Sequence, residues 1–349
     1  MTVTVNTVTV NIDQSATLLE VLRAVTGDPD LAYAAEPRSL SGGFWAELLA
    51  FSLANPPAGW PGELVARIMP EARTARKETI IQAAVAAAGF PTPVVRASGR
   101  DCRLGPAFLI MDRVAGVHLL TGLTGAGAIA SVATAMRELP GVLATTMAGL
   151  HSLDPAPVRA QLGSSGDIPV TVPEMLARFR AMARDCGRAD LTAAAQWLID
   201  SPLPAAPEVI CHGDLHPFNV LVDGAHVCLI DWSSALLAPR PCDVGFTSLV
   251  LAEPPLAVPR AARPLLRRAG AWLARRFVAR YEQESGVRID SRELQWYQGF
   301  SCLRALVEAA GWSRLGIAEA RADHPWLVSG PAFARRLTAL TGSRVRAAS

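Results

Sequence analysis

Three polar side chains that could bind a metal ion or accept a proton stand close together in the middle of the chain. Asp214 and Asn219 lie five residues apart across a loop, and Asp231 follows the next apolar stretches. An Asp-Gly pair at 223–224 between two valine-containing segments predicts a hairpin that brings Asp231 back towards Asn219. Carboxylate and amide oxygens suit Mg²⁺, which binds through one or two carboxylates together with substrate phosphates. A carboxylate that does not bind the metal could accept the proton of a hydroxyl group.

The residues around these side chains resemble the aminoglycoside phosphotransferase family, also called the phosphotransferase enzyme family, of protein-kinase-like fold. The family carries H-G-D-x-x-x-x-N and then I-D-W, which residues 212–219 and 230–232 match, and the resemblance covers roughly residues 38–310. It implies a Mg²⁺-assisted transfer of phosphate from ATP or GTP, with Asp214 as the catalytic base and Asn219 and Asp231 as metal ligands. The alternative is that these polar residues only cap loops.

The resemblance also implies residues that support the loop and cover the nucleotide. His212 is expected to orient the catalytic loop, and Asp243, which matches a later family aspartate, to hydrogen-bond the loop's backbone. The glycine hairpin that covers phosphates in kinase-like folds corresponds to Ser41-Gly42-Gly43, although bulky Phe44-Trp45 follows it here. The alternative for this segment is an ordinary hairpin turn.

The nucleotide phosphates need a cation on a strand, paired with a glutamate on the next helix. The only lysine, Lys77, falls in a predicted helix, so the strand cation is expected to be Arg67, a residue type that also occurs at this position in the family. Its expected partner is Glu78; the alternative is that Arg67 is an exposed strand residue. The segment from Met111 to Val114 resembles the hinge whose backbone contacts adenine, with a buried strand and an ordinary exit turn as the alternative.

The elements that must position these residues change character along the chain. Residues 1–37 form an extension with a short helix over 15–26. Up to residue 112 the pattern then predicts one main helix over 74–89 and short strands at 40–53, 64–69, 92–97 and 107–111. From residue 113 helical spacing dominates, with a strand island at 209–211, 220–222 and 227–230; the helices are expected at 129–153, 173–199, 262–284 and 293–311.

These patterns predict an α+β, bilobal, kinase-like fold. A small strand-rich N-terminal nucleotide-binding lobe (1–112) precedes a larger helical C-terminal lobe (113–349) that contains the catalytic hairpin and the acceptor site.

The composition, 50% hydrophobic and 18% charged, excludes a disordered chain, and the net charge of +2 gives no reason to expect a nucleic-acid partner. Six cysteines without zinc-ligand spacing are expected to be free thiols. With no signal peptide or membrane-spanning run, a cytoplasmic protein is expected.

The charge is unevenly distributed, and this bears on the substrate. Residues 254–349 hold 16 arginines and 7 acidic residues, a balance of +9, so residues 1–253 carry −7 of the total of +2. Family acceptor sites are built mainly from the helical C-terminal part, so a neutral or anionic small-molecule acceptor is favoured over a polycationic aminoglycoside. Acidic residues that could make the acceptor site locally negative are Glu282, Glu284, Asp290 and Glu293. The alternative function is a non-catalytic pseudokinase that binds a nucleotide or metabolite; the oligomeric state stays open.

Overall fold

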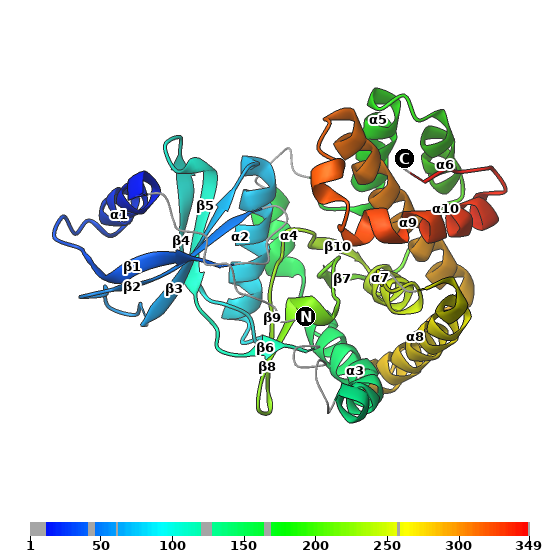
Figure 1. Ribbon diagram of the computed structural model, residues 1–349, viewed down its shortest axis with the longest axis horizontal. Coiled ribbons are helices and arrows are strands. Elements are labelled where there is room, and N and C mark those ends of the chain that lie inside the picture. Colours follow the sequence, from blue (N-terminus) through cyan, green and yellow to red (C-terminus); the bar gives the residue numbers. More distant parts are fainter. Residues whose placement is uncertain are drawn as a thin grey trace. The chain divides into compact units, whose positions relative to one another are not determined.

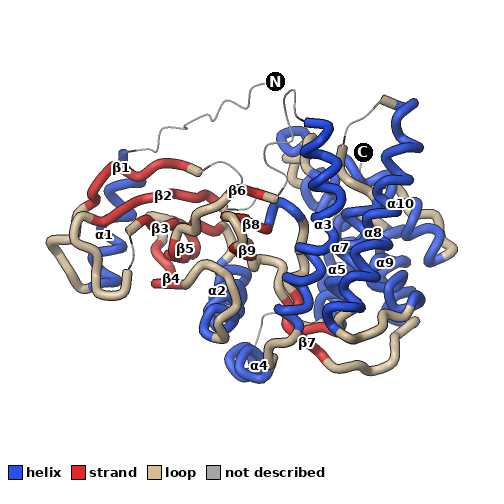
Figure 2. Tube along the Cα trace, turned by 90° about the horizontal axis from the view of Figure 1, so that it is seen from below, coloured by secondary structure: helices blue, strands red, loops and turns tan. Residues whose placement is uncertain are grey.

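The chain folds into two compact units. The computed structural model describes residues 12–40, 46–60, 62–119, 128–163, 169–256 and 259–347 (Figures 1 and 2). The first unit draws on the described residues within Met1–Val117, Ala160–Ile168 and Leu221–Ser233. The second draws on those within His118–Arg159, Pro169–Val220 and Ser234–Ser349.

The first unit is built on a five-stranded antiparallel sheet with the strand order β1-β2-β3-β5-β4. Its strands are rich in Leu, Ile, Val and Phe where they are buried, as expected for residues that pack on a pleated surface. The strands are β1 (Tyr33–Ser39), β2 (Glu47–Leu53), β3 (Glu63–Met69), β4 (Val95–Asp101) and β5 (Gly105–Asp112).

One helix packs against each face of this sheet, as Figure 1 shows for α1 and α2. Helix α1 (Ile12–Thr26) covers one face of the sheet. It shares a core with the side chains of β3 that point to that face, among them Leu64 and Ile68. Helix α2 (Ala72–Ala87) packs on the opposite face, where Met69 lies. Because side chains alternate along a strand, Arg67 of β3 points to the face that α2 covers.

A hairpin late in the sequence belongs to the same unit. Its strands β8 (Val220–Asp223) and β9 (His226–Leu229) form a small sheet with β6 (Val117–His118), in the order β6-β8-β9. The Leu229 N–H donates to the carbonyl of Pro91 at 3.0 Å, and the Thr92 hydroxyl donates to the carbonyl of Leu229 at 2.9 Å. The indole N–H of Trp232, which is fully buried, donates to that hydroxyl at 2.8 Å. These bonds fix the strand that leads into Asp231.

The second unit is mainly helical. Its largest core gathers apolar residues of α5, α6, α9 and α10, such as Phe179, Leu191, Phe300 and Leu337. Helix α8 packs on α3 and α7, and strand β7 (Glu208–Cys211) pairs with β10 (Leu236–Pro239). The helices are α3 (Ala128–His151), α4 (Ala156–Gly163), which runs into the first unit, α5 (Val172–Asp185), α6 (Ala189–Asp200), α7 (Pro241–Ala252), α8 (Arg263–Ser285), α9 (Ser291–Arg314) and α10 (Pro325–Thr341); short 3₁₀ turns are η1 (Pro217–Asn219), η2 (Arg260–Ala262) and η3 (Glu319–Arg321).

The architecture is the predicted α+β fold, with strands early and helices late. The helix predicted over 173–199 is wrong in one respect: it is two helices, α5 and α6, because the chain turns at Gly187. All six cysteines are free thiols, as expected. Within the described ranges, no helix combines the length and apolarity that a bilayer crossing requires.

Candidate active site

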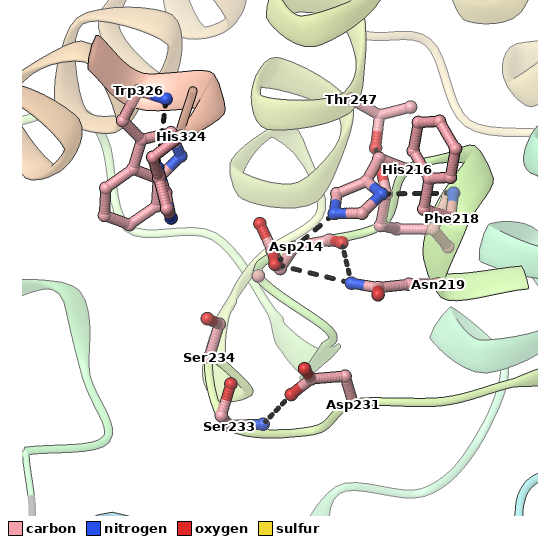
Figure 3. Close-up of polar contacts among 12 residues, drawn as sticks. Asp214, His216, Phe218, Asn219, Asp231, Ser233, Ser234, Thr247, His324 and Trp326 are labelled. Carbon is pink, nitrogen blue, oxygen red and sulfur yellow. Dashed lines mark hydrogen bonds and ion pairs between the residues drawn. The ribbon is translucent and has the colours of Figure 1, made fainter. Parts of the chain in front are cut away.

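The loop between β7 and β8 presents Asp214 and Asn219 together. The side-chain N–H₂ of Asn219 donates to the backbone carbonyl of Asp214 at 2.9 Å and to its carboxylate at 3.3 Å (Figure 3). These bonds use the amide nitrogen, so the Asn219 amide oxygen makes no hydrogen bond to any described residue and is available as a ligand. The Asp214 side chain is 21% exposed, so its carboxylate lies at the surface of the second unit. The two residues therefore lie together in this loop.

Asp243, at the start of α7, holds the backbone just before Asp214. Its two carboxylate oxygens accept hydrogen bonds from the N–H groups of His212 at 2.7 Å and Gly213 at 2.6 Å. Asp243 is fully buried, and burial alone would raise its pKa. The hydrogen bond from His151, the charges of His151 and His212 and the Gly213 N–H outweigh burial, and the pKa of Asp243 is lowered. Asp243 thus stays ionised and serves as an acceptor for the loop.

His151 and Cys211 complete a buried cluster behind the loop. Within the described part of the chain, His151, Cys211 and Asp243 are the one group whose potential metal-ligating atoms lie within 4.8 Å of one another. Both nitrogens of His151 already have partners, the Tyr281 hydroxyl at 2.7 Å and Asp243 at 3.2 Å. Burial raises the pKa of the Cys211 thiol well above its usual value, so this sulfur is not a thiolate. The cluster therefore supports the loop, and His212 is itself fully buried.

Arg304 of α9 also contacts the loop, and the amino-acid sequence does not predict this contact. One terminal N–H₂ group donates to the carbonyl of Gly213 at 2.7 Å, and the other donates to the hydroxyl of Ser234 at 2.6 Å. The available signal was an Arg304–Glu308 pair, four residues apart, inside the otherwise apolar stretch from Cys302 to Ala310. A charged pair that must be buried needs partners, but the sequence does not identify them.

In the first unit, Arg67 joins two carboxylates. Its Nε lies 3.2 Å from Glu78 of α2, and its Nη2 donates to Asp231 at 2.9 Å. The side chains of Arg67 and Glu78 are 6% and 1% exposed, so the alternative of an exposed Arg67 is wrong. Burial would lower the pKa of Arg67, but Glu78 and Asp231 raise it on balance. For Glu78 burial exceeds the attraction of Arg67 and raises the pKa to about 7.

Asp231 has an unusual backbone conformation. Its φ is 65°, in the left-handed region, and it is the only residue other than glycine with a positive φ in the described ranges. Such a conformation costs about 1–2 kcal/mol for a residue with a Cβ and persists only where surrounding contacts maintain it. The ion pair with Arg67 and a hydrogen bond from the Ser233 N–H at 3.3 Å (Figure 3) are such contacts. They hold the Asp231 carboxylate, which is 30% exposed, in one direction.

The predicted hinge lies at the end of β5. The N–H groups of Asp112 and Arg113 donate to the carbonyls of Val94 and Glu63, both at 3.0 Å. Val114 follows the strand, and its backbone makes no hydrogen bond to another described residue. Met111 faces α2, where its sulfur lies 3.5 Å from the amide nitrogen of Gln82. Ser41, Gly42 and Gly43, the predicted glycine hairpin, lie outside the described residues.

Known structures share this fold at low sequence identity. A Ralstonia eutropha protein assigned to the aminoglycoside phosphotransferases is 19% identical, with a TM-score of 0.61 over 94% of this chain and 98% of its own. A thermostable mutant of the aminoglycoside phosphotransferase APH(4)-Ia, in complex with ADP and hygromycin B, is 19% identical, with a TM-score of 0.57 over 93% and 98%. A choline/ethanolamine kinase family protein from Mesorhizobium loti is 16% identical, with a TM-score of 0.53 over 94% and 99%.

These neighbours confirm the predicted kinase-like fold. No curated protein sequence matches the chain. The model of the phosphotransferase enzyme family, however, matches residues 54–286, which is well over half of the sequence and includes Arg67, Asp214 and Asp231. The family predicted from the motif around Asp214 is thus confirmed: the chain belongs to the phosphotransferase enzyme family, with its kinase-like fold.

Proposed function

We propose that the protein transfers the γ-phosphate of ATP, or of GTP, to a hydroxyl group of a small molecule. The observation that carries this proposal is the Asp214–Asn219 pair in a loop whose backbone Asp243 holds from behind. Asp214 is a carboxylate at the surface of its unit, as a group that accepts a proton from an incoming hydroxyl must be. Family membership and a neighbour that binds ADP support the same reaction.

The donor set fits Mg²⁺. Asn219 turns its amide nitrogen towards Asp214, which leaves the amide oxygen for a metal, and Asp231 supplies a carboxylate. Oxygen-only ligands are those that Mg²⁺ prefers beside phosphate groups. The ion would neutralise charge on the phosphates. In this proposal Arg67, which Glu78 fixes, would bind phosphate oxygens of the nucleotide, and the backbone near Met111 and Val114 would contact the adenine.

The acceptor is proposed to be neutral or anionic. Three of the four acidic residues that could attract a polycation serve local structure. Glu282 pairs with Arg288 at 3.0 Å, Glu284 pairs with Arg280 at 2.9 Å, and Asp290 caps the start of α9. Glu308, the further acidic residue near Asp214, pairs with Arg304 at 3.5 Å. These four acidic residues are thus already engaged with neighbouring groups, which supports a neutral or anionic acceptor.

The test is phosphorus NMR of the full chain with Mg-ATP and a panel of acceptors. The panel contains neutral polyols and macrolides, sugar phosphates, amino alcohols and aminoglycosides. We expect a new phosphoester signal with a neutral or anionic acceptor, none with an aminoglycoside, and a loss of turnover on the order of 1000-fold in Asp214→Asn. An Asp214→Asn protein that turns over at the parental rate would sink the assignment, and turnover of aminoglycosides alone would overturn the acceptor class.

A second function is favoured by the direct Arg67–Asp231 ion pair, which engages one oxygen of the proposed metal ligand. In this reading the protein binds a nucleotide and does not transfer phosphate. Calorimetry would then show Mg-ATP binding while phosphorus NMR shows neither ADP nor a phosphoester with any acceptor, water included. Slow formation of ADP that Asp214→Asn abolishes decides against this alternative.

A further inference from the structure

We propose that Arg304 of α9 is a positioning residue for Asp214, a role that rests on the proposed phosphotransferase function. The carbonyl to which Arg304 donates belongs to the peptide that joins Gly213 to Asp214. A hydrogen bond of 2.7 Å to this oxygen restrains the plane of that peptide, and so restrains the direction in which the Asp214 side chain leaves the backbone.

The loop is held from two sides. Asp243 accepts from the N–H groups of His212 and Gly213, and Arg304 donates to the carbonyl of Gly213, so one group of each of the three successive peptides before Asp214 is bonded to a side chain. The second bond of Arg304, to Ser234, ties the loop to the segment that leaves the hairpin three residues after Asp231. A single side chain thus bonds both the loop before Asp214 and Ser234.

Arg304 is itself held in place, as a positioning residue must be. Its side chain is only 14% exposed, and its guanidinium lies 4.9 Å from the ring centre of Trp326. Glu308, one turn further along α9, lies 3.5 Å from Nε and balances the charge. The planar guanidinium donates in several fixed directions at once, whereas a lysine ammonium is a compact point charge on a flexible stem. The geometry therefore requires arginine rather than any cation.

The test compares Arg304→Lys and Arg304→Met with Arg336→Met. Arg336 also lies on a C-terminal helix, and it hydrogen-bonds Gln298 without touching the loop, so it controls for the loss of a partly buried arginine. Hydrogen exchange measured by mass spectrometry reports on the amides of His212 and Gly213 whether or not the protein is active. Mg-ATP hydrolysis, with water as the acceptor, gives kcat and KM, and calorimetry gives the affinity for Mg-ATP.

We expect Arg304→Met to speed exchange of the peptide that contains residues 212–214 and to lower kcat on the order of 100-fold, with KM for ATP within about twofold. Arg304→Lys should fall between the parent and Arg304→Met, and Arg336→Met should match the parent in both measurements. Parental kcat or parental loop exchange in a folded Arg304→Lys would overturn the role of Arg304. A parent that hydrolyses no ATP speaks against the phosphotransferase function instead, and the exchange measurement still decides whether Arg304 positions the loop.

Discussion

At the scale of single residues, the replacement of a kinase-type lysine by Arg67 changes how the cation is held. A guanidinium can meet Glu78 through Nε and Asp231 through Nη2 at the same time, which one ammonium on a flexible stem does not do with the same geometry. Breaking a buried ion pair by removing one partner leaves an uncompensated charge and is strongly destabilising. Arg67 therefore holds both Glu78 and Asp231 in the unliganded protein.

This predicts that Arg67→Lys weakens Mg-ATP binding by about 10-fold or more, because a lysine cannot keep both carboxylates in place. The matched control is Arg103→Lys in the same unit. Arg103 makes a two-pronged contact with Asp101, at 3.1 and 2.9 Å, and neither residue belongs to the proposed nucleotide site, so the affinity of this variant for Mg-ATP should stay parental. Titration calorimetry with Mg-ATP measures both variants. Equal affinities for the parent and Arg67→Lys would contradict the role of Arg67.

At the scale of elements, the sequence predicts the helices that have a clear apolar periodicity. It does not predict a helix that is almost fully buried or one that contains a proline. The spacing of apolar residues predicted α2, α3, α8 and α9 within a few residues. Helix α7 was missed because ten of its twelve residues are buried, so it shows no polar face for a periodic pattern to reveal. Helix α10 contains Pro331, which reads as a helix breaker in sequence.

The residues of the candidate site were likewise predictable only in part. Asp214, Asn219 and Asp231 carry a fixed spacing that a short motif preserves, and Arg67 with Glu78 follows from the strand and helix that hold them. Arg304 could not be found, since its contact to Gly213 joins residues 91 positions apart and depends on how α9 packs. The left-handed backbone at Asp231 is likewise a product of tertiary contacts, which override the local preference of a residue with a Cβ.

The loop that carries Asp214 needs a glycine at position 213, and this can be tested. Gly213 has a φ of 73°, and a Cβ added there would lie 2.3 Å from the carbonyl oxygen of Ser234. Gly224, in the turn between β8 and β9, has a φ of 58° but open space around its Cβ position. Alanine at Gly224 should cost about 1–2 kcal/mol of unfolding free energy from backbone strain alone. Alanine at Gly213 adds the steric clash and should cost about 2 kcal/mol more.

Urea unfolding measures the two variants, and ATP turnover shows whether Gly213→Ala also displaces Asp214. We expect turnover to fall in Gly213→Ala and to stay within about twofold of the parent in Gly224→Ala. If both alanine variants lost the same stability, the close approach of the loop to Ser234 would not be a constraint on this fold.

At the scale of the whole molecule, two buried groups in different units should make opposite contributions to stability as the pH falls. Burial raises the pKa of Glu78, in the first unit, to about 7. Its folded form therefore binds more protons than its unfolded form between about pH 4.5 and 7, so acid stabilises this unit through Glu78. Burial, followed by the charge of Arg321, lowers the pKa of His324, in the second unit, to about 4, although Asp214 opposes the shift. Between about pH 6.5 and 4 the unfolded state binds the extra proton, so acid destabilises the second unit.

The structural reason lies in the cap of α10. The His324 Nδ1 accepts a hydrogen bond from the Trp326 N–H at 3.2 Å, and a protonated ring nitrogen cannot accept it.

Replacement of His324 by asparagine keeps a capping oxygen and removes the titration. On going from pH 7.5 to 5, the parent should lose about 1–2 kcal/mol of unfolding free energy more than His324→Asn does. His226→Asn, a replacement of an exposed histidine in β9 that caps no helix, is the control variant. Urea unfolding at the two pH values, together with hydrogen exchange of α10 and α2 peptides, measures both effects. Equal acid sensitivity of the parent and His324→Asn would show that this cap does not set the acid limit of the second unit.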